Sequence, residues 1–333
     1  MKAVVYTEYG SPDVLHVTEI EKPTPKDNEV LIKIHAVPVN FGDMMARDFK
    51  AVSLREFNMP SFLWLIARAS MGFNKPKNPI LGSEFAGEIE AVGQNVTRFK
   101  VGDPVFGYRG QSMGCYTEYL CMPAEGLLEM RPANMTAEEA ATIPYGALTA
   151  LNLLKKVNIQ PGQKVLINGA SGGIGSAALQ LARHYGAEVT GVCSTARVEF
   201  VKTLGADHVI DYTQEDFTQN GQTYDLIFDI LGRCSFSKCK KSLKSGGRLL
   251  YASFKMKQLF QMLWTSRLGD KKVICALSME KPEDLTVIKG LVEEGAIKTA
   301  IDTHYPLEQA AEAHRYYANS KKGHVVITVA HSA

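Results

Sequence analysis

The sequence predicts an α/β protein of two domains, a small β-rich domain followed by a doubly wound parallel sheet. Three observations support this prediction: the length, a change of pattern near Thr136, and a glycine-rich turn between a strand and a helix. A chain of 333 residues exceeds the ~250–300 residues at which single cores usually stop growing. The hydrophobic share of 45% and the charged share of 22% are those of an ordinary globular protein.

The N-terminal part alternates short β-like runs with Gly/Pro turns. Residues 2–6, 29–34, 87–92 and 103–108 are such runs, and no long helical pattern separates them except within 50–79. Closely spaced strands of this kind are typical of a small β-rich domain or barrel.

The segment 50–79 contains a helix-like stretch at 62–67 and a basic turn at 75–77. Its aromatic side chains would either line an apolar wall over a hydrophobic acceptor or cover the barrel, and both interpretations stay open. A third interpretation is peripheral contact with a membrane. The aromatic residues concerned are Phe57, Phe62, Trp64 and Phe73.

From Thr136 the pattern changes. Thr136 and Glu139 match a capping box, which predicts a helix start. Strand-like and helix-like stretches then alternate, and this alternation predicts a parallel, doubly wound sheet. The expected strands are 165–168, 188–193, 208–211, 224–229, 248–253 and 272–277, with helices from 174 and near 197–204 and 236–243, and with a last helix at 307–318 and a last strand at 325–329.

The stretch 164–176 predicts dinucleotide binding. An apolar strand at 164–168 runs into the small residues 169–175 and then into a helix. Glycines let the backbone approach a pyrophosphate, and the helix N-terminus offers unpaired N–H groups and a partial positive charge. Strand, turn, helix and second strand all follow in the required order, which makes the motif more specific than a lone glycine pattern.

The end of the second strand predicts NADPH as the cofactor. An NAD-preferring site places Asp or Glu there, about 20 residues on, to bind the ribose 2′-hydroxyl. This chain has Ser194, Thr195 and Arg197 instead, with no carboxylate in the stretch. The hydroxyls donate hydrogen bonds and Arg197 pairs with a 2′-phosphate. The alternative is a solvated arginine in the first turn of a helix.

Composition narrows the class of protein. A formal charge of +2 gives no electrostatic case for nucleic acid or membrane binding. The N-terminus predicts a strand and lacks the apolar core of a signal peptide, and no stretch is apolar enough to span a bilayer. We therefore expect a cytoplasmic protein. The cysteines show no paired spacing, so thiols are expected at 115, 121, 193, 234, 239 and 275.

These motifs together resemble the zinc-free quinone oxidoreductase (zeta-crystallin-like) branch of the medium-chain dehydrogenase/reductase superfamily. The resemblance covers essentially the whole chain. The matching stretches are 1–5, 9–12, 23–25, 29–33, 39–43, 81–87, 101–103, 148–150, 169–175 and 323–327.

The resemblance implies a fold and an assembly. A GroES-like β-barrel catalytic domain is expected from residues 1–124 and 278–333, and a Rossmann NADPH-binding domain from 125–277. Family members often dimerise through the edge strand of the Rossmann sheet, for which 272–277 is an apolar candidate. The resemblance thus implies a homodimer.

The resemblance also implies site residues. Ser171, Gly172, Gly173 and Ile174 would hold the pyrophosphate. The remaining cofactor contacts would come from Ser194, Arg197 and Tyr212 around the 2′-phosphate, from Leu231, Tyr251 and Ser253 along the ribose and nicotinamide, and from Thr149 and Asn40 at the nicotinamide end.

No metal is expected. Zinc-dependent relatives carry a Cys near the 40–43 segment and a His in a Gly-His-Glu motif, where this chain has Ser83 and no nearby Cys. Only Cys115 and Cys121 fall in the region of the structural zinc lobe, and two thiols cannot form a four-thiolate site. Without a Lewis acid, zinc alcohol dehydrogenase activity is excluded.

The expected substrate is an acceptor that is already electrophilic, a quinone or an α,β-unsaturated carbonyl. The protein then mainly positions the reactants and excludes water. Asn40 is the candidate for orienting the carboxamide or the substrate oxygen, with a cap at the strand end as the alternative. Asp43 is expected in a local structural hydrogen bond, with proton transfer as the alternative. Arg47 is expected in a surface salt bridge, with polarisation of a substrate oxygen as the alternative. Met45 stands where these reductases commonly have Tyr.

The sequence therefore predicts an NADPH-dependent, zinc-independent quinone or enone reductase acting on a small molecule. An enoyl-thioester or 2-alkenal reductase is the main alternative, although Phe49, Lys50 and Ala51 lack the Tyr that such enzymes carry there. A cofactor-binding protein with a non-enzymatic role is the alternative from another class.

Overall fold

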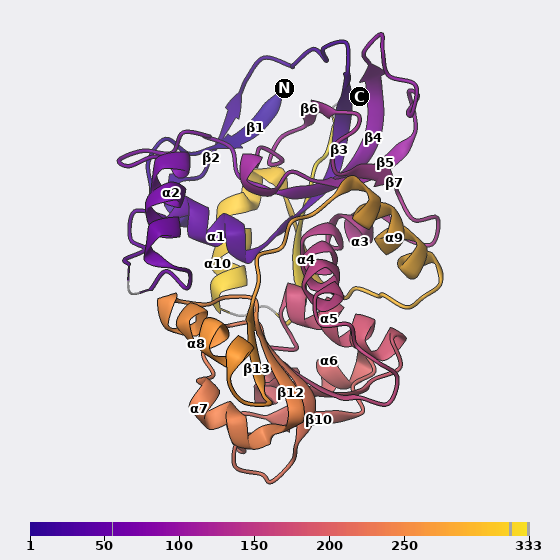
Figure 1. Ribbon diagram of the computed structural model, residues 1–333. Helices are drawn as coiled ribbons and strands as arrows, with labels where there is room; N and C mark the ends of the chain where they lie inside the picture. The colour runs from indigo at the N-terminus through magenta and orange to yellow at the C-terminus, as the bar shows by residue number, and fades with distance from the viewer. Residues whose placement is uncertain (55, 320–321, 332–333) are drawn as a thin grey trace. The chain divides into compact units, whose positions relative to one another are not determined.

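The computed structural model describes residues 1–54, 56–319 and 322–331 (Figure 1). The chain forms two compact units, each built from separate stretches. The first unit comprises Met1–Ser53, Ile66–Tyr145 and Lys281–Ala333, and the second comprises Leu54–Leu65 and Gly146–Glu280.

The first unit is built on a seven-stranded sheet with the order β14-β15-β3-β4-β5-β7, in which β6 also pairs with β3. Most of its pairs are antiparallel, and β14 and β15 pair in parallel. A separate two-stranded ladder joins β1 (Lys2–Val5) to β2 (His16–Glu19). The strands of the large sheet are β3 (Glu29–Val39), β4 (Glu84–Val92), β5 (Pro104–Tyr108), β6 (Tyr119–Pro123), β7 (Leu128–Met130), β14 (Ile301–Pro306) and β15 (His324–Thr328).

The two ends of the chain meet in this sheet. β15 lies antiparallel to β3, with Val326 opposite Pro38, so the C-terminal segment completes the N-terminal β-rich unit. Apolar side chains of both segments enter one core, among them Ile32, Ile34, Val325 and Ile327, all fully buried. The β-rich unit and the return of the C-terminal tail were both predicted.

The helices of the first unit pack around this sheet or border it. Thr136 caps α3 in the predicted capping box, with its hydroxyl oxygen accepting from the amide of Glu139 and the Glu139 carboxylate accepting from the amide of Thr136. The helices are α1 (Phe41–Arg47), α3 (Ala137–Ala141), α9 (Pro282–Glu293) and α10 (Ala310–Asn319), and α2 (Ser61–Met71) crosses the division between the units.

The second unit is the predicted parallel sheet, six strands in the order β10-β9-β8-β11-β12-β13. All its pairs are parallel. The strand order reverses between β8 and β11, so the first and fourth strands along the chain are neighbours at the centre. The strands are β8 (Lys164–Asn168), β9 (Glu188–Cys193), β10 (His208–Asp211), β11 (Tyr224–Asp229), β12 (Leu243–Tyr251) and β13 (Lys272–Cys275).

Helices connect four of the five consecutive pairs of these strands, as expected for a doubly wound sheet, and residues 212–223 between β10 and β11 form no helix. The interiors of β8 and β11 are buried, which matches their apolar sequences. Among the described residues, no helix is both long and apolar enough to cross a bilayer. The helices are α4 (Pro144–Lys155), α5 (Gly173–His184), α6 (Val198–Thr203), α7 (Phe236–Cys239) and α8 (Met256–Arg267).

The division into units differs from the predicted domain boundaries. Residues 125–145 belong with the β-rich unit, because β7 pairs with β5 and α3 packs on β3 and β4. Residues 54–65 belong with the second unit, where Asn58 donates to the carbonyl oxygen of Leu231 at 2.6 Å. Both segments take part in packing that no local pattern indicates.

Candidate active site

A glycine-rich turn joins β8 to α5. The amides of Gly169 and Ala170 both donate to the carbonyl oxygen of Val192, at 3.1 and 3.0 Å. These two bonds hold the turn against β9. α5 then begins at Gly173, with Gly172 as its N-cap. The predicted order of strand, turn, helix and second strand is therefore present.

Two glycines of this turn are required by its geometry. Gly169 has a φ of +97°, a conformation that side chains disfavour. A Cβ on Gly175 would lie 2.0 Å from the carbonyl oxygen of Gly169, so α5 starts directly against the turn only because Gly175 has no side chain. α4 also approaches the start of α5 closely, since a Cβ on Gly146 would lie 2.5 Å from the carbonyl oxygen of Gly173.

The N-terminus of α5 fits the diphosphate of a dinucleotide. The first amides of a helix lack partners within the helix, and Gly172 provides no side-chain cap for them. The aligned peptide dipoles add a partial positive charge. A Cβ on Gly172 would meet only the carbonyl oxygen of Gly169, at 3.6 Å, so this glycine leaves room beside the helix end. Residues 171–174 therefore form a cradle suited to an anion.

The end of β9 carries Ser194 and Arg197, as predicted. The carbonyl oxygen of Ser194 accepts from the amide of Arg197 at 2.8 Å, in a short helical turn that leaves Arg197 partly exposed. Tyr212 follows the neighbouring strand, with its amide on the carbonyl oxygen of Cys193 at 3.0 Å and its side chain 62% exposed.

The structure adds a carboxylate that the sequence argument for NADPH did not include. Asp211 ends β10 and stands opposite Cys193 in the sheet, and it accepts from the hydroxyl of Thr195 at 2.6 Å. The expectation of no carboxylate at this end of β9 is therefore wrong. Residues 194–197 contain none, but the fold places Asp211 of the neighbouring strand beside them. Parallel pairing of β9 and β10 is the cause.

Asp211 is charged near neutral pH, because hydrogen bonds from Thr195 and Thr213 lower the pKa of its carboxyl. Arg197 carries the opposite charge near the same end of β9. Burial, and then Asp211, raise the pKa of the Cys193 thiol to about 11, against the opposite effect of Arg197. Two opposite charges, those of Asp211 and Arg197, therefore lie at the end of β9.

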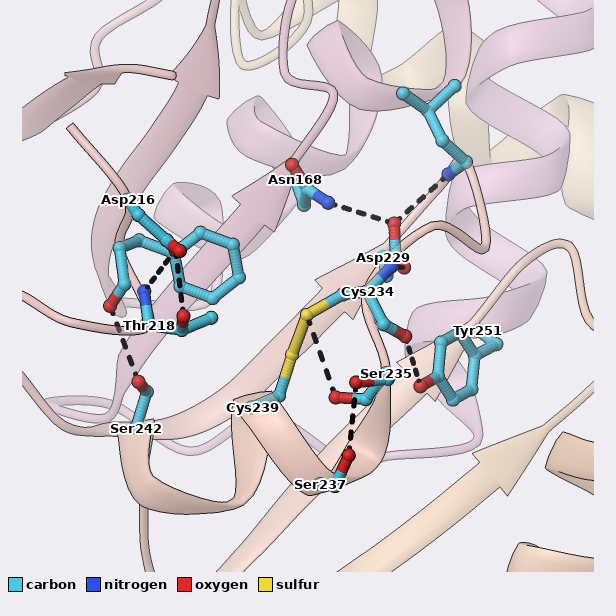
Figure 2. Close-up of a disulfide and its surroundings, with 12 residues drawn as sticks. Asn168, Asp216, Thr218, Asp229, Cys234, Ser235, Ser237, Cys239, Ser242 and Tyr251 are labelled. Carbon is cyan, nitrogen blue, oxygen red and sulfur yellow. Dashed lines mark hydrogen bonds between the residues drawn. A yellow bond between two sulfur atoms is a disulfide. The ribbon is translucent and has the colours of Figure 1, made fainter. Parts of the chain in front are cut away.

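The point where the strand order reverses is marked by a buried carboxylate. Asp229 ends β11 and is fully buried. Its Oδ1 accepts from Nδ2 of Asn168, the last residue of β8, at 3.0 Å and from the amide of Leu231 at 3.2 Å (Figure 2). Open α/β sheets bind ligands at such a point. Leu231, predicted to line the cofactor, comes two residues after Asp229 and is 42% exposed.

Tyr251 and Ser253 follow the end of β12. Tyr251 is fully buried and donates its hydroxyl to the carbonyl oxygen of Cys234 at 2.6 Å, so that hydroxyl holds the loop after β11 (Figure 2). The two loops touch, since a Cβ on Gly232 would lie 2.2 Å from the carbonyl oxygen of Ser253. A contact of Tyr251 with a cofactor stays a prediction.

The predicted cofactor residues thus follow the carboxyl ends of β8 to β12 at one edge of one sheet. Thr149 differs, because it lies buried on α4. Asn40 belongs to the first unit.

Asn40 caps α1. Its Oδ1 accepts from the amide of Asp43 at 3.1 Å, and the Asp43 carboxylate accepts from the amide of Asn40 at 3.0 Å. The Nδ2 group donates to Oγ of Ser83 at 2.8 Å and to Oε1 of Glu84 at 3.2 Å. An amide nitrogen carries two hydrogens, so both have acceptors here. The cap is present, and direct contact with a substrate stays a prediction.

A directed chain of hydrogen bonds continues from Asp43. Nη1 of Arg47 lies 2.9 Å from Nδ1 of His314, and arginine has only donors. Nδ1 therefore accepts, and Nε2 carries the proton and donates to the Tyr116 hydroxyl at 3.0 Å. That hydroxyl donates to Oδ2 of Asp43 at 3.5 Å. Burial, and then Arg47, lower the pKa of His314 to about 3, so the ring is neutral near neutral pH.

The two carboxyls beside Asn40 have raised pKa values. Burial raises the pKa of Asp43 to about 7, against the amide donors of Asn40 and Gly82. Burial raises the pKa of Glu84 to about 8, against the amide of Tyr145, which donates to it at 2.8 Å, and against Asn40. This network therefore holds a proton near neutral pH and can keep it away from water.

Sequence reasoning identified Asn40 and Asp43 but missed Tyr116 and His314 as members of this network. These two residues stand 198 positions apart, and no local pattern links them. The predicted surface salt bridge of Arg47 is wrong. Arg47 is only 7% exposed and donates through Nε to the carbonyl oxygen of Gly10 at 3.0 Å.

Ser83, which the resemblance predicts to stand in place of a ligating His, accepts through Oγ from Nδ2 of Asn40 at 2.8 Å. Within residues 1–54, 56–319 and 322–331, no three His, Cys, Asp or Glu side chains gather as metal ligands.

The expectation of six thiols is wrong for one pair, because Cys234 and Cys239 form a disulfide (Figure 2).

Both parts of the chain match known sequence families. Residues 26–132 match the family described as alcohol dehydrogenase GroES-like domain, and residues 204–327 match the family described as zinc-binding dehydrogenase.

The relatives extend over nearly the whole chain. The chloroplast envelope quinone oxidoreductase homolog of Arabidopsis thaliana is 31% identical, covering 97% of this chain and 96% of the relative. The chloroplastic NADPH-dependent alkenal/one oxidoreductase of the same plant is 31% identical, covering 98% and 79%. Among solved structures, the quinone oxidoreductase from Coxiella burnetii superimposes with a TM-score of 0.82 at 27% identity, covering 99% of both chains.

Proposed function

This chain belongs to the quinone oxidoreductase branch of the medium-chain dehydrogenase/reductase superfamily, and we propose that it is an NADPH-dependent reductase of quinones or α,β-unsaturated carbonyls that works without zinc. The observation that carries the proposal is the carboxyl edge of the parallel sheet, with the anion cradle at 171–174 and Arg197 beside it. Bound there, a nicotinamide dinucleotide supplies hydride.

NADPH is proposed over NADH because Arg197 can form a charge-assisted, forked hydrogen bond with a 2′-phosphate. Asp211 opposes this preference. Its oxygens already accept from Thr195 and Thr213, at 2.6 Å and, for the Thr213 amide and hydroxyl, at 2.9 and 2.8 Å. A carboxylate with three of its roughly four acceptor sites occupied is less available to bind a ribose hydroxyl. This difference favours the phosphorylated cofactor.

The chain's own residues bind, orient and exclude water. Ser171, Gly172, Gly173 and Ile174 are proposed to hold the diphosphate, and Asn168 and Asp229 brace the turn that presents it. Asn40 acts as a positioning residue, because its amide joins α1 to Ser83 and Glu84. A conjugated acceptor needs no metal to receive hydride, which suits a site where Ser83 replaces a ligand.

The test is NADPH oxidation by purified full-length protein with quinones, alkenals and enoyl thioesters, repeated with NADH. We expect oxidation with at least one conjugated class and none with saturated ketones of matched size, which serve as the control. Retained NADPH binding without oxidation of any acceptor would contradict the reductase and favour a non-enzymatic cofactor-binding role.

Reduction of enals and enones is the second candidate, favoured by the relative named NADPH-dependent alkenal/one oxidoreductase. It shares the hydride donor and differs only in the acceptor. The ratio of kcat/KM for an alkenal and for a quinone of similar size distinguishes the two.

A homodimer is also proposed, since β13 is an edge strand of the sheet and edge strands present unpaired backbone groups. Light scattering at micromolar concentration should give twice the mass of the 36.6 kDa chain, and the mass of one chain would contradict it. A cytoplasmic location stays a prediction from the sequence.

A further inference from the structure

A disulfide closes the loop that follows β11. It joins Cys234 in the loop to Cys239 at the end of α7, five residues later. Cys239 is fully buried and Cys234 is partly exposed. The other four cysteines, 115, 121, 193 and 275, are free thiols. The two sulfurs of this bond therefore differ in how far a reactant can reach them.

Polar contacts hold the Cys234 backbone from two sides (Figure 2). Its amide donates to Oδ2 of Asp229 at 2.7 Å, and its carbonyl oxygen accepts from the Tyr251 hydroxyl at 2.6 Å. Oδ1 of the same Asp229 accepts from Asn168, where the glycine-rich turn begins. Cys234 is thus two hydrogen bonds away from the turn proposed to bind diphosphate, and the disulfide is its covalent tie to α7.

Cys234 also lines a cavity of about 340 Å³. Arg233 and Lys238, both exposed, line the same cavity, together with Asn168 and Asp216. The two cations outnumber the one carboxylate, and that carboxylate already has partners. Its Oδ1 accepts from the amide and hydroxyl of Thr218 at 2.9 and 2.8 Å, and its Oδ2 accepts from the side-chain amide of Gln219 at 3.2 Å. The cavity therefore suits a small molecule that carries carboxylates and brings it to the partly exposed Cys234.

We propose that Cys234 and Cys239 form a thiol–disulfide exchange site for a small carboxylate-bearing thiol and its disulfide, and that reduction weakens dinucleotide binding by loosening the loop that carries Leu231. The effect of reduction on dinucleotide binding rests on the proposed function, and the exchange site does not.

The exchange takes place in two steps, in which atoms and electrons balance. The thiolate of one small thiol attacks Sγ of Cys234 and forms a mixed disulfide, while the bond to Cys239 breaks and Cys239 leaves as a thiolate that takes up a proton. A second small thiol attacks the sulfur that the first small thiol contributed to the mixed disulfide. This attack releases the small disulfide and leaves Cys234 as a thiol. The protein disulfide is reduced to two thiols and two small thiols are oxidised to one disulfide. The reverse steps form the protein disulfide.

The test equilibrates the full chain with reduced and oxidised glutathione at a series of ratios, without dinucleotide or acceptor. Acid quenching, alkylation and peptide mass mapping then give the state of each cysteine. We expect one redox transition at Cys234–Cys239, with no glutathione attached to the four free cysteines. Absence of the 234–239 cross-link at every ratio would overturn the exchange site.

Two matched variants test the difference between the sulfurs. In Cys239→Ser, the partly exposed Cys234 should accumulate the mixed disulfide, since no neighbouring thiol removes it. In Cys234→Ser, the buried Cys239 should stay a thiol. Equal modification of the two variants contradicts entry through the cavity.

The coupling is measured by titrating NADPH into the oxidised and reduced forms. We expect roughly five- to tenfold weaker binding to the reduced form, at the lower end of typical coupling between sites. Equal affinities overturn the coupling. Failure of NADPH to bind either form overturns both the coupling and the proposed function, whereas the exchange site is judged by the peptide map alone.

Discussion

The two units use polar groups in opposite ways. In the second unit, the carboxyl edge of the sheet ends in an uncapped helix N-terminus and a partly exposed arginine, groups arranged to receive a ligand. In the first unit, the network from Arg47 through His314 and Tyr116 to Asp43 bonds its members to one another in the interior. Changes at the open edge should therefore alter binding, and changes in the closed network should alter stability.

We expect the largest effect at Gly175, because the start of α5 lies directly against the backbone of the glycine-rich turn at this residue. Gly175→Ala places a Cβ 2.0 Å from the carbonyl oxygen of Gly169, and backbone cannot move aside as a side chain can. We expect dinucleotide binding to fall by at least about 100-fold and the free energy of unfolding to fall by roughly 2–4 kcal/mol. Fluorescence titration and urea denaturation measure these two quantities.

Gly172→Ala is the matched control in the same turn. Its Cβ would meet only one oxygen at 3.6 Å, so stability should change by less than about 1 kcal/mol. Dinucleotide binding should still weaken, because the methyl group fills the cradle. Equal loss of stability in the two variants would refute the packing role given to Gly175.

Asn40→Asp should be the most damaging single change in the closed network. Aspartate keeps the oxygen that accepts from Asp43, but it cannot donate to Ser83 or Glu84 and it faces two buried carboxyls. We expect a loss of about 3 kcal/mol in the free energy of unfolding near neutral pH, measured in urea. A loss below about 1 kcal/mol would show that the network is not closed as described.

His314 should make stability depend on pH. In the unfolded chain its pKa is near 6.5, and in the folded protein burial lowers it to about 3. The folded state therefore binds fewer protons in this window, and stability is lost as the pH falls through it. Between pH 6.5 and 5, the wild type should lose about 2 kcal/mol more than His314→Gln, whose amide keeps an acceptor for Arg47 and a donor for Tyr116.

The raised pKa values of Asp43 and Glu84 act in the opposite direction, since their contribution is lost as the pH rises. Both proteins contain these carboxyls, so their effect cancels in the difference. Parallel pH profiles for the wild type and His314→Gln would exclude the neutral, buried ring.

We expect the smallest effect at Asp211, which lies at the carboxyl edge of the parallel sheet in the second unit. Asp211→Asn removes the charge that opposes a 2′-phosphate while keeping an oxygen for the Thr195 hydroxyl. NADPH should bind about two- to fivefold more tightly, with NADH changed less, as for a partly exposed charge. Tighter binding of NADH would instead identify Asp211 as a ligand of the ribose hydroxyl.

The open edge was largely predictable from the sequence and the closed network was not. Strand, turn and helix at 164–184 are adjacent along the chain, so their order fixes their geometry. The contact between Asp211 and Thr195 needed the pairing of β9 with β10. The chain of bonds from Arg47 through His314 needed the C-terminal segment to return to the β-rich unit, and the 234–239 disulfide needed the conformation of one loop.

The most direct test of the proposed cofactor site is the pair of dissociation constants for NADPH and NADH, in the wild type and in Arg197→Glu. The wild type should bind NADPH at least roughly tenfold more tightly than NADH, since a charge-assisted bond contributes about 1.5–3 kcal/mol. Arg197→Glu should abolish that preference while leaving the NADH value within about threefold. A wild type that prefers NADH, or a variant in which both constants change equally, would contradict a 2′-phosphate site at the end of β9.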